Sequence, residues 1–460
     1  METKTKYKRI VVLGFALFAM FFGAGNVILP PMLGFTARQN WLSGFLVFIV
    51  ADAGLAVLAL VAASRKQDGI KSVIGVLGKV PSTILILMNA VCIGPLVAIP
   101  RTGSVTYELA VKPFFANCPT WVSWVTSIVF FLIVALLCIR PTKVVDIVGK
   151  ILSPLMLAAL GVLIVVGVVR GGQIPSTGVS VADSLKKGLT DGYQTMDMLG
   201  AMMFSGLTLA NVSRAGFTGK KQYKAVIGAG LIAALGLFLV YGGLTYLGAA
   251  TMVNLPADAD RTVLLVAITE AIFGKFGMVL LGFIVACACL TTAIGLVSAI
   301  SELFCSLLHC KMQVFYPVFV VASCVISCAI SNVGTTTILN MAAPVLELIY
   351  PIFFVLVALS FFSAHIHSKL IYWLPSACAV LTAAYTLIDT RLLQGALHSA
   401  SLPLSSVGLS WMLPAAVGLV AGLLLSLLLH KRKSKQPTTD APSSELPDRQ
   451  ILQDATPSEA

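Results

Sequence analysis

Residues 21–31 read Phe-Phe-Gly-Ala-Gly-Asn-Val-Ile-Leu-Pro-Pro and lie within the first apolar segment of the chain, Val11 to Leu33. The segment is long enough to cross a bilayer, but glycine and proline weaken or end helices. Lipid offers no hydrogen bonds to the backbone groups that such a break would free. We therefore predict a helix break that faces protein or a water-filled cavity, as at a ligand or ion site at membrane depth.

The composition around this stretch is that of a polytopic membrane protein. Of the 460 residues, 58% are hydrophobic and only 11% are charged, with a mean hydropathy of +0.96, whereas soluble domains carry roughly 25% charged residues. We predict an all-α fold with 12 transmembrane helices. They are expected near residues 9–34, 42–64, 82–110, 120–139, 145–169, 193–213, 223–249, 276–307, 314–331, 337–363, 368–389 and 409–430.

The net charge of +12 indicates topology rather than nucleic-acid binding, because the basic residues lie mostly in short loops between apolar segments. They are concentrated on the side of the N-terminus, which predicts cytoplasmic termini and a cell (inner) membrane location. Residues 1–8 form a cytoplasmic N-terminus, 171–192 an extracellular loop and 431–460 a disordered cytoplasmic tail. In a second long loop, the apolar stretch Thr262 to Phe273 is predicted to form a short helix.

A second interrupted helix is expected at residues 193–206, where small and polar residues again lie at mid-membrane. It comes five spans after the first, so the charge-derived topology runs the two in opposite directions. Two interrupted helices of opposite direction, five spans apart, indicate an inverted repeat. The chain would then contain two five-helix units, at 9–170 and 193–363.

The first break offers groups for both kinds of ion. Free amides around Gly23, Ala24 and Gly25 suit a carboxylate, and free carbonyls with the Asn26 oxygen suit Na⁺. The alternative is close helix packing through small residues. In the eighth span, Thr291 and Thr292 could supply two oxygens to a desolvated cation, although such hydroxyls often bond to their own helix.

Charged residues within the spans are further candidates, because a charge in a membrane is costly. Asp52 could be protonated, paired or part of an ion path, and Asp197 could hold the second break or face a substrate ammonium group. For each charge, structural pairing is the alternative to ligand contact. Met203 and Phe204 could line an apolar pocket or simply pack. The other charges singled out are Arg101, Glu108, Glu302 and Glu347.

Soluble-type catalysis finds little support in the sequence. The five histidines lie in loops or at span ends, and there is no HExxH and no phosphate-binding GxxxxGK[ST] motif. We therefore expect no enzyme and no cofactor. An ion channel and a membrane-embedded enzyme are the rival classes, although the enzyme would need a converging catalytic set that the sequence lacks.

Several long motifs, in order, resemble the branched-chain amino acid:cation symporters of bacteria (the LIVCS family). They are GFALFAMFFGAGNVILPPMLG at 14–34, GPLVAIPRTGSVTYE at 94–108, GYQTMDMLGAM at 192–202, ACLTTAIGL at 288–296, SNVG at 331–334 and PVLELIYP at 344–351. The resemblance implies the LeuT-like architecture of two inverted five-helix repeats, with peripheral helices in 364–430. It also implies leucine, isoleucine and valine as substrates and Na⁺ as the coupling ion. We expect the protein to be a monomer in contact with membrane lipid.

The resemblance also implies site residues. The Na⁺ ligands would be the carbonyls of Ala19, Phe22 and Ala288 with the hydroxyls of Thr291 and Thr292. The amino acid would lie between the two breaks, against Gly23, Ala24, Gly25, Asn26, Asp197, Gly200, Met203 and Phe204. Coupling to H⁺, or transport of another neutral amino acid, is the alternative.

Overall fold

The computed structural model describes residues 2–65, 68–115, 118–139, 153–170, 172–253, 260–366 and 368–434. Within these ranges the elements are all helical, which confirms the predicted all-α class. Ten helices there are long and apolar enough to cross a membrane, by length and composition. The 12 spans and the 5+5 inverted repeat remain predictions. Counted by length and composition, residues 24–64 are one continuous stretch, so the number of separate spans is not fixed by this count.

The first half of the chain contains nine helices in its described residues. They are α1 (Glu2–Phe21), α2 (Ala24–Ala37), α3 (Trp41–Ile49), α4 (Leu55–Ser64), α5 (Lys71–Ile74), α6 (Lys79–Val91), α7 (Ala98–Thr106), α8 (Thr120–Cys138) and α10 (Ser153–Arg170). Three π-helical turns interrupt the spans, at Val50–Gly54, Cys92–Leu96 and Tyr107–Val111. Such turns are frequent at functional sites.

The second half begins with the other interrupted helix. Its helices are α11 (Val181–Gln194), α12 (Asp197–Arg214), α13 (Gly219–Ala250), α14 (Arg261–Leu307), α15 (Met312–Ser331), α16 (Thr335–Ser360), α17 (Leu370–Arg391) and α18 (Met412–Ser434). Helix α14 kinks at Gly274, whose φ of 62° is open to glycine. The helix expected at Thr262 to Phe273 is therefore confirmed as the part of α14 before the kink.

Both predicted breaks exist. The first separates α1 from α2 at Phe22 and Gly23, and the second separates α11 from α12 at Thr195 and Met196, where Met196 has a φ of 68°. Pro30 and Pro31, however, do not end a helix but lie inside α2. Because proline has no N–H, these two residues leave the carbonyls four positions earlier without their helical donors.

Within the predicted extracellular loop at 171–192, residues 181–194 form the helix α11. Helix α11 is amphipathic and polar, with an ion pair between Lys187 and Asp191 one turn apart, so its hydropathy resembles that of a loop. The predicted tail at 431–460 is also shorter than expected, since α18 continues to Ser434. The rest of that tail lies outside the described residues.

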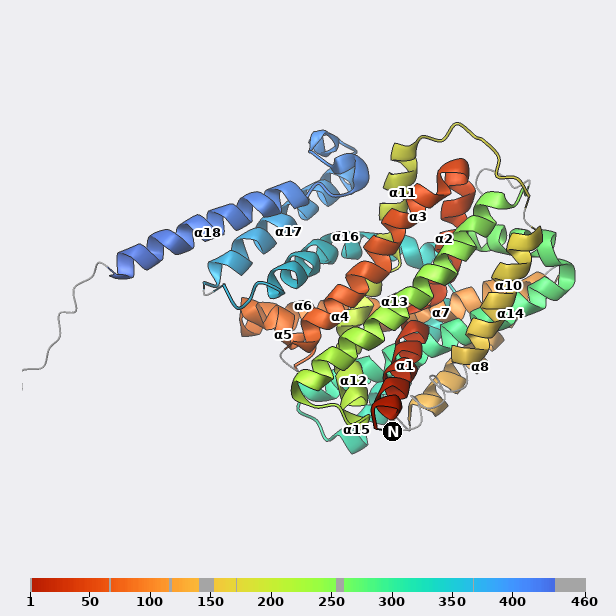
Figure 1. Ribbon diagram of the computed structural model, residues 1–460, viewed down its shortest axis with the longest axis horizontal. Coiled ribbons are helices and arrows are strands. Elements are labelled where there is room, and N and C mark those ends of the chain that lie inside the picture. Colours follow the sequence, from red (N-terminus) through yellow and green to blue (C-terminus); the bar gives the residue numbers. More distant parts are fainter. Residues whose placement is uncertain are drawn as a thin grey trace, which may run out of the picture.

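Figure 1 shows how the helices are arranged around the two breaks. Helix α13 lies beside α1 and α2, α11 packs beside α3, and α12 packs beside α4. Helices α17 and α18 pack on each other at one edge of the molecule, joined to the rest through α16. The N-terminus lies at the same end as the end of α12, where Arg9 donates a hydrogen bond to the carbonyl of Ala215 at 2.8 Å.

Glycines let two pairs of helices touch backbone to backbone. A Cβ atom on Gly34 of α2 would lie 1.8 Å from the carbonyl oxygen of Thr245 in α13, and one on Gly248 would lie 2.0 Å from that of Pro31. A Cβ atom on Gly188 of α11 would lie 2.1 Å from the carbonyl oxygen of Gly44 in α3. Small residues thus fix each half of a broken helix, α2 and α11, to a continuous neighbour.

Candidate functional site

A central cavity lies where the two breaks meet. It has about 30 Å³ of space for the centre of a water-sized sphere, which is room for about two water molecules. Its lining comes from both breaks, from the third span and from α14: Met20, Phe21, Gly23, Ala24, Asn26, Ile93, Ala98, Arg101, Thr102, Thr195, Met196, Asp197, Gly200, Phe204, Thr292 and Leu296. Six of the eight predicted substrate-site residues line this cavity, and Gly25 and Met203 do not.

Both glycines of the Gly-Ala-Gly stretch lie close against side chains of neighbouring helices. A Cβ atom on Gly23 would lie 2.8 Å from the hydroxyl of Thr292, and one on Gly25 would lie 2.8 Å from the guanidinium group of Arg101. Gly23 is the N-cap of α2 and has no side chain to cap that helix. The first turn of α2 therefore presents its positive end at the cavity, which suits an anionic group.

Arg101 holds the end of α11 at the second break. Its two terminal nitrogens donate to the carbonyl oxygens of Gln194 and Thr195, each at 3.3 Å. These carbonyls end a helix that no longer continues, so the guanidinium group satisfies acceptors at its negative end. The Arg101 Nε atom is buried without a hydrogen-bond partner among the described residues.

Asn26 links the two breaks. Its side-chain amide donates to Asp197 Oδ2 at 2.7 Å and also to the Tyr241 hydroxyl of α13. Asn26 and Asp197 stand in the first turns of α2 and α12, so the bond joins the start of one broken half to the start of the other. The prediction that Asn26 belongs to the site is consistent with this position, although its contact is with protein.

Asp52 lies behind Asp197 and is fully buried, with 0% of its surface exposed. It stands in the π-helical turn at Val50–Gly54, and its Oδ1 accepts a hydrogen bond from the Thr195 hydroxyl at 2.7 Å. The Asp197 carboxyl group and the Tyr241 hydroxyl lie within electrostatic reach of it. The polar cluster at the second break thus consists of Asp52, Asp197, Asn26, Thr195 and Tyr241.

A set of oxygens next to the first break suits an alkali cation. The Thr291 hydroxyl lies 2.9 Å from the carbonyl oxygens of both Ala19 and Ala288, and the Thr292 hydroxyl lies 3.1 Å from that of Met20. Four of the five implied Na⁺ ligands therefore converge, and Phe22 stands directly at the break. The oxygens are neutral, and backbone carbonyls freed at unwound helices are what coupling ions coordinate in transporters.

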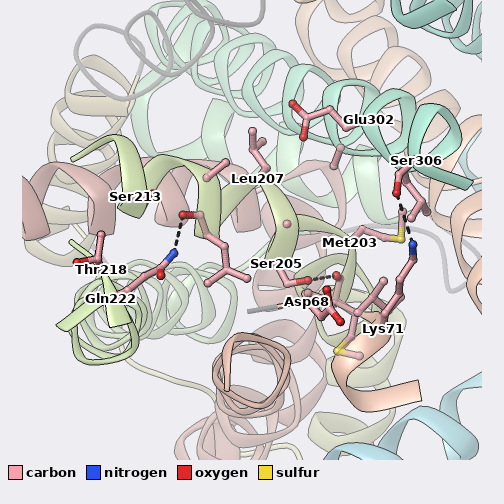
Figure 2. Close-up of a pocket in the computed structure, with 18 of the residues that line it drawn as sticks. Asp68, Lys71, Met203, Ser205, Leu207, Ser213, Thr218, Gln222, Glu302 and Ser306 are labelled. Atoms are coloured by element: carbon pink, nitrogen blue, oxygen red, sulfur yellow. Dashed lines mark hydrogen bonds between the residues drawn. The ribbon is translucent and has the colours of Figure 1, made fainter. Parts of the chain in front are cut away.

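Two of the remaining candidates, Met203 and Glu302, lie away from the central cavity. Met203 lines a larger cavity of about 590 Å³, together with Ser205, Gln222 and Glu302 (Figure 2). This cavity lies along the second half of α12, at the end of the molecule that holds the N-terminus, and not at the central cavity. Phe204 lines the central cavity instead, with its ring 5.9 Å from that of Phe21.

Glu108 and Glu347 are structural or peripheral in this structure. Glu108 accepts a hydrogen bond from the Thr335 amide at 3.0 Å and so caps the N-terminus of α16. Glu347 was expected within a span as a buried charge, but its side chain is 52% exposed and lies 4.0 Å from Arg391. Its interaction is a weak exposed ion pair.

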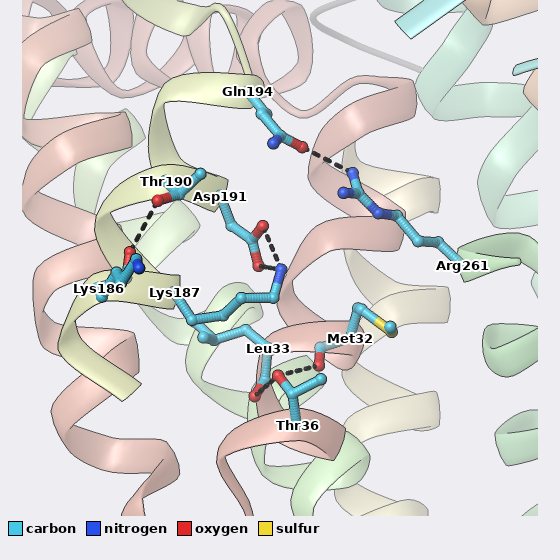
Figure 3. A network of polar contacts seen from close by, with 9 residues as sticks. All are labelled: Met32, Leu33, Thr36, Lys186, Lys187, Thr190, Asp191, Gln194 and Arg261. Carbon is cyan, nitrogen blue, oxygen red and sulfur yellow. Dashed lines mark hydrogen bonds and ion pairs between the residues drawn. The ribbon is translucent and has the colours of Figure 1, made fainter. Parts of the chain in front are cut away.

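Polar contacts tie the helices together at the opposite end from the larger cavity. Arg261 of α14 donates to the side-chain oxygen of Gln194 at 2.8 Å, and Lys187 bonds both oxygens of Asp191 at 2.5 and 2.6 Å (Figure 3). Thr336 of α16 donates to Asp260 at 2.7 Å. Side-chain hydrogen bonds therefore join α11 to α14, and the start of α14 to α16, on this side of the molecule.

Three residues that contact the site were not predicted from the sequence. Tyr241, Thr195 and Met20 all contact predicted site residues. Tyr241 is one of three tyrosines in a long apolar span, and the Met20 contribution is a backbone carbonyl, so neither has a signal in residue type. Thr195 stands two residues before Asp197 in the stretch predicted to be broken, and this adjacency could have identified it.

An all-helical fold, two broken helices around a cavity and charged groups at the breaks define a multi-pass membrane transporter. Known proteins agree: the model of the family described as branched-chain amino acid transport protein matches residues 6–429. The chain belongs to this family, and it is therefore a transport protein and not an enzyme.

Among its relatives, the branched-chain amino acid permease BrnQ of Bacillus subtilis is 35% identical over 449 residues, covering 94% of this chain and 100% of that protein. The permease BraB of the same organism is 33% identical over 444 residues, covering 94% and 99%.

Solved structures of other transporters share the overall all-helical fold. A Na⁺-coupled sialic acid symporter in a substrate-bound outward-open state aligns over 90% of both chains, with a TM-score of 0.55 and 14% identity. The nucleobase-cation-symport-1 family transporter Mhp1, closed around bromovinylhydantoin, aligns over 92% of this chain and 93% of its own, with a TM-score of 0.51 and 15% identity. At these identities the likeness concerns the fold alone.

Proposed function

We propose that this protein imports leucine, isoleucine and valine across the cell (inner) membrane by Na⁺-coupled symport, as a monomer with both termini in the cytoplasm. The observation that carries the proposal is the central cavity, which joins an uncapped helix start, a carboxylate and an apolar wall. Its membership of the branched-chain amino acid transport family and the names of its relatives support the substrate.

In this proposal the three parts of the cavity receive the three parts of the amino acid. The substrate carboxylate meets the first-turn amides of α2, and the ammonium group meets Asp197. The branched side chain lies against Gly200, Phe204 and Leu296, which line the same cavity. Burying such a side chain contributes about 1.5–3 kcal/mol, and one methylene changes binding by only about 1–3 kcal/mol, so the three substrates compete for one site.

The cavity must enlarge to take its substrate, because room for about two waters does not hold a leucine. The larger cavity on the N-terminal side and the polar contacts on the opposite side support an inward-facing arrangement. Na⁺ at the Thr291 and Thr292 oxygens would stabilise the break of the first span in the outward-open state. The inward Na⁺ gradient would then drive accumulation by alternating access.

Uptake of labelled leucine into proteoliposomes tests this function. It should require an inward Na⁺ gradient and should be inhibited by unlabelled isoleucine and valine but not by alanine. Replacing Thr291 and Thr292 together by alanine should raise the Na⁺ concentration for half-maximal uptake about tenfold. The control is Thr269→Ala, since that hydroxyl bonds only the Leu265 carbonyl of its own helix among the described contacts.

Three results would redirect the proposal. Uptake that ignores Na⁺ and follows a proton gradient would favour H⁺ coupling, for which the buried carboxyl groups of Asp52 and Asp197 are the candidates. Strong inhibition by an unrelated neutral amino acid would assign another substrate. Leucine-independent single-channel currents would indicate a channel.

A further inference from the structure

The two aspartates at the second break are placed unequally. Asp197 is 8% exposed and lines the central cavity, whereas Asp52 is 0% exposed and lies behind it. The two carboxyl groups lie within electrostatic reach of each other. The Thr195 hydroxyl, which bonds Asp52 Oδ1 at 2.7 Å, lies 3.5 Å from the Asp197 amide nitrogen, and Asp52 Oδ2 is buried without a hydrogen-bond partner among the described residues. The fully buried oxygen is thus an acceptor that lacks a hydrogen.

The hydrogens available to the pair can be counted. The Thr195 hydroxyl has one hydrogen but lies 2.7 Å from both Asp52 Oδ1 and the Gly192 carbonyl oxygen, which can only accept. Asp197 Oδ2 takes a hydrogen from Asn26. The neighbouring side chains therefore leave acceptors unsatisfied, and two buried carboxylates held next to the same hydroxyl are costly to ionise together.

The sum of the charges around Asp52 and Asp197 is zero when the two carboxyl groups together carry one proton. Arg101 of α7 is the cation that interacts with Asp197. Tyr241 of α13 faces both carboxyl groups, and Tyr350 of α16, which packs against the ring of Tyr193 of α11 at 4.7 Å, lies within electrostatic reach of both. With neutral tyrosines, one proton on the pair makes the buried site neutral overall.

We propose that Asp52 and Asp197 share one proton, and that binding of the substrate ammonium group at Asp197 releases this proton to water. In this step the O–H bond of the carboxylic acid breaks and the proton passes to water, while the carboxylate left on Asp197 pairs with the substrate R–NH₃⁺. The electron pair of the broken O–H bond stays on the carboxylate oxygen, so the step needs no oxidant or reductant.

Charge balance links this step to the coupling ion. The zwitterionic substrate adds no net charge, but Na⁺ adds one positive charge to a desolvated site that was neutral before. Loss of one proton restores neutrality, which favours release because uncompensated buried charge is costly. This part of the inference rests on the proposed function, whereas the shared proton itself does not.

Calorimetric titration of the Na⁺-free, detergent-solubilised full chain with leucine and Na⁺ added together tests the release. In two buffers of different ionisation enthalpy at pH 7, the difference in heat should correspond to nearly one proton released per leucine bound. Asp52→Asn should still bind leucine but release almost none, and Asp52→Glu should restore release. The matched control Glu347→Gln, at an exposed position, should behave as the unaltered protein.

Buffer-independent heat in the unaltered protein, or full release from Asp52→Asn, would overturn the proposal. If leucine does not bind at all, the proposed function fails, and infrared spectroscopy of the ligand-free protein still decides on the pair. A shared proton predicts a carboxylic-acid band that shifts in D₂O and disappears in both Asp52→Asn and Asp197→Asn. Retention of the band in Asp52→Asn would show that Asp197 is protonated on its own account.

Discussion

The side chain of residue 200 decides how much room the central cavity offers. Gly200 lines it, and a Cβ atom there would meet only the Phe204 ring, at an ordinary 3.8 Å. A methyl group therefore fits without strain but occupies part of a cavity that is already small. A substitution at residue 200 can therefore change substrate binding without destabilising the fold.

We expect Gly200→Ala to raise the KM for leucine and isoleucine about tenfold and that for valine less, because valine is one methylene smaller. Initial uptake rates at varied substrate concentration provide the measurement. Gly161→Ala is the control, since a Cβ atom there meets nothing within 4 Å and α10 does not line the cavity. An equal loss for all three substrates, or a change in Vmax alone, would place Gly200 outside the substrate pocket.

At the scale of elements, the contacts of α11 hold the second break from the side opposite the larger cavity. Arg261 bonds the Gln194 side chain, and Arg101 bonds the Gln194 and Thr195 carbonyls. A hydrogen bond to a charged group contributes about 1.5–3 kcal/mol. Loss of the Arg261 bond removes a contact between α11 and α14 while leaving the cavity lining intact.

Arg261→Ala should therefore favour the outward-facing state. The KM for external leucine should fall several-fold, and Vmax should fall with it because return from the outward state becomes slower. Uptake kinetics in proteoliposomes provide the measurement, with Arg391→Ala as the control at an exposed arginine. Unchanged KM and Vmax would mean that the bond does not contribute to closure.

The elements also show what the sequence could and could not predict. The break at Gly23 was predictable because glycines and an asparagine interrupt an apolar segment, whereas α11 was not. Its lysines and aspartates give it the hydropathy of a loop, and only the fold shows that Lys187 neutralises the buried Asp191. Similarly, charge within a span predicted Asp52 and Glu347 equally, since sequence does not reveal which helix face is buried.

At the scale of the whole molecule, the two ends differ in how far they open. The larger cavity lies at the end that holds the N-terminus, and the polar contacts of α11, α14 and α16 lie at the other. If the N-terminus is cytoplasmic, the molecule is open to the inside. Gly206 lines the larger cavity, and a Cβ atom there meets nothing within 4 Å.

A cysteine at position 206 should accordingly react with a membrane-impermeant maleimide in inside-out vesicles and not in intact cells. Thr190→Cys, on the exposed surface of α11, should show the reverse pattern. Labelling of the unaltered protein, which has ten cysteines, sets the background. Reaction of the cysteine at position 206 from the outside alone would reverse the predicted topology.

The glycine contacts described above determine what can move. Since α2 touches α13 and α11 touches α3 through their backbones, neither broken half can rotate alone. Each break is therefore the hinge about which two packed helices would move together. A cross-link that fixes α3 in place should therefore immobilise α11 as well, and so should arrest the transport cycle without touching the substrate cavity.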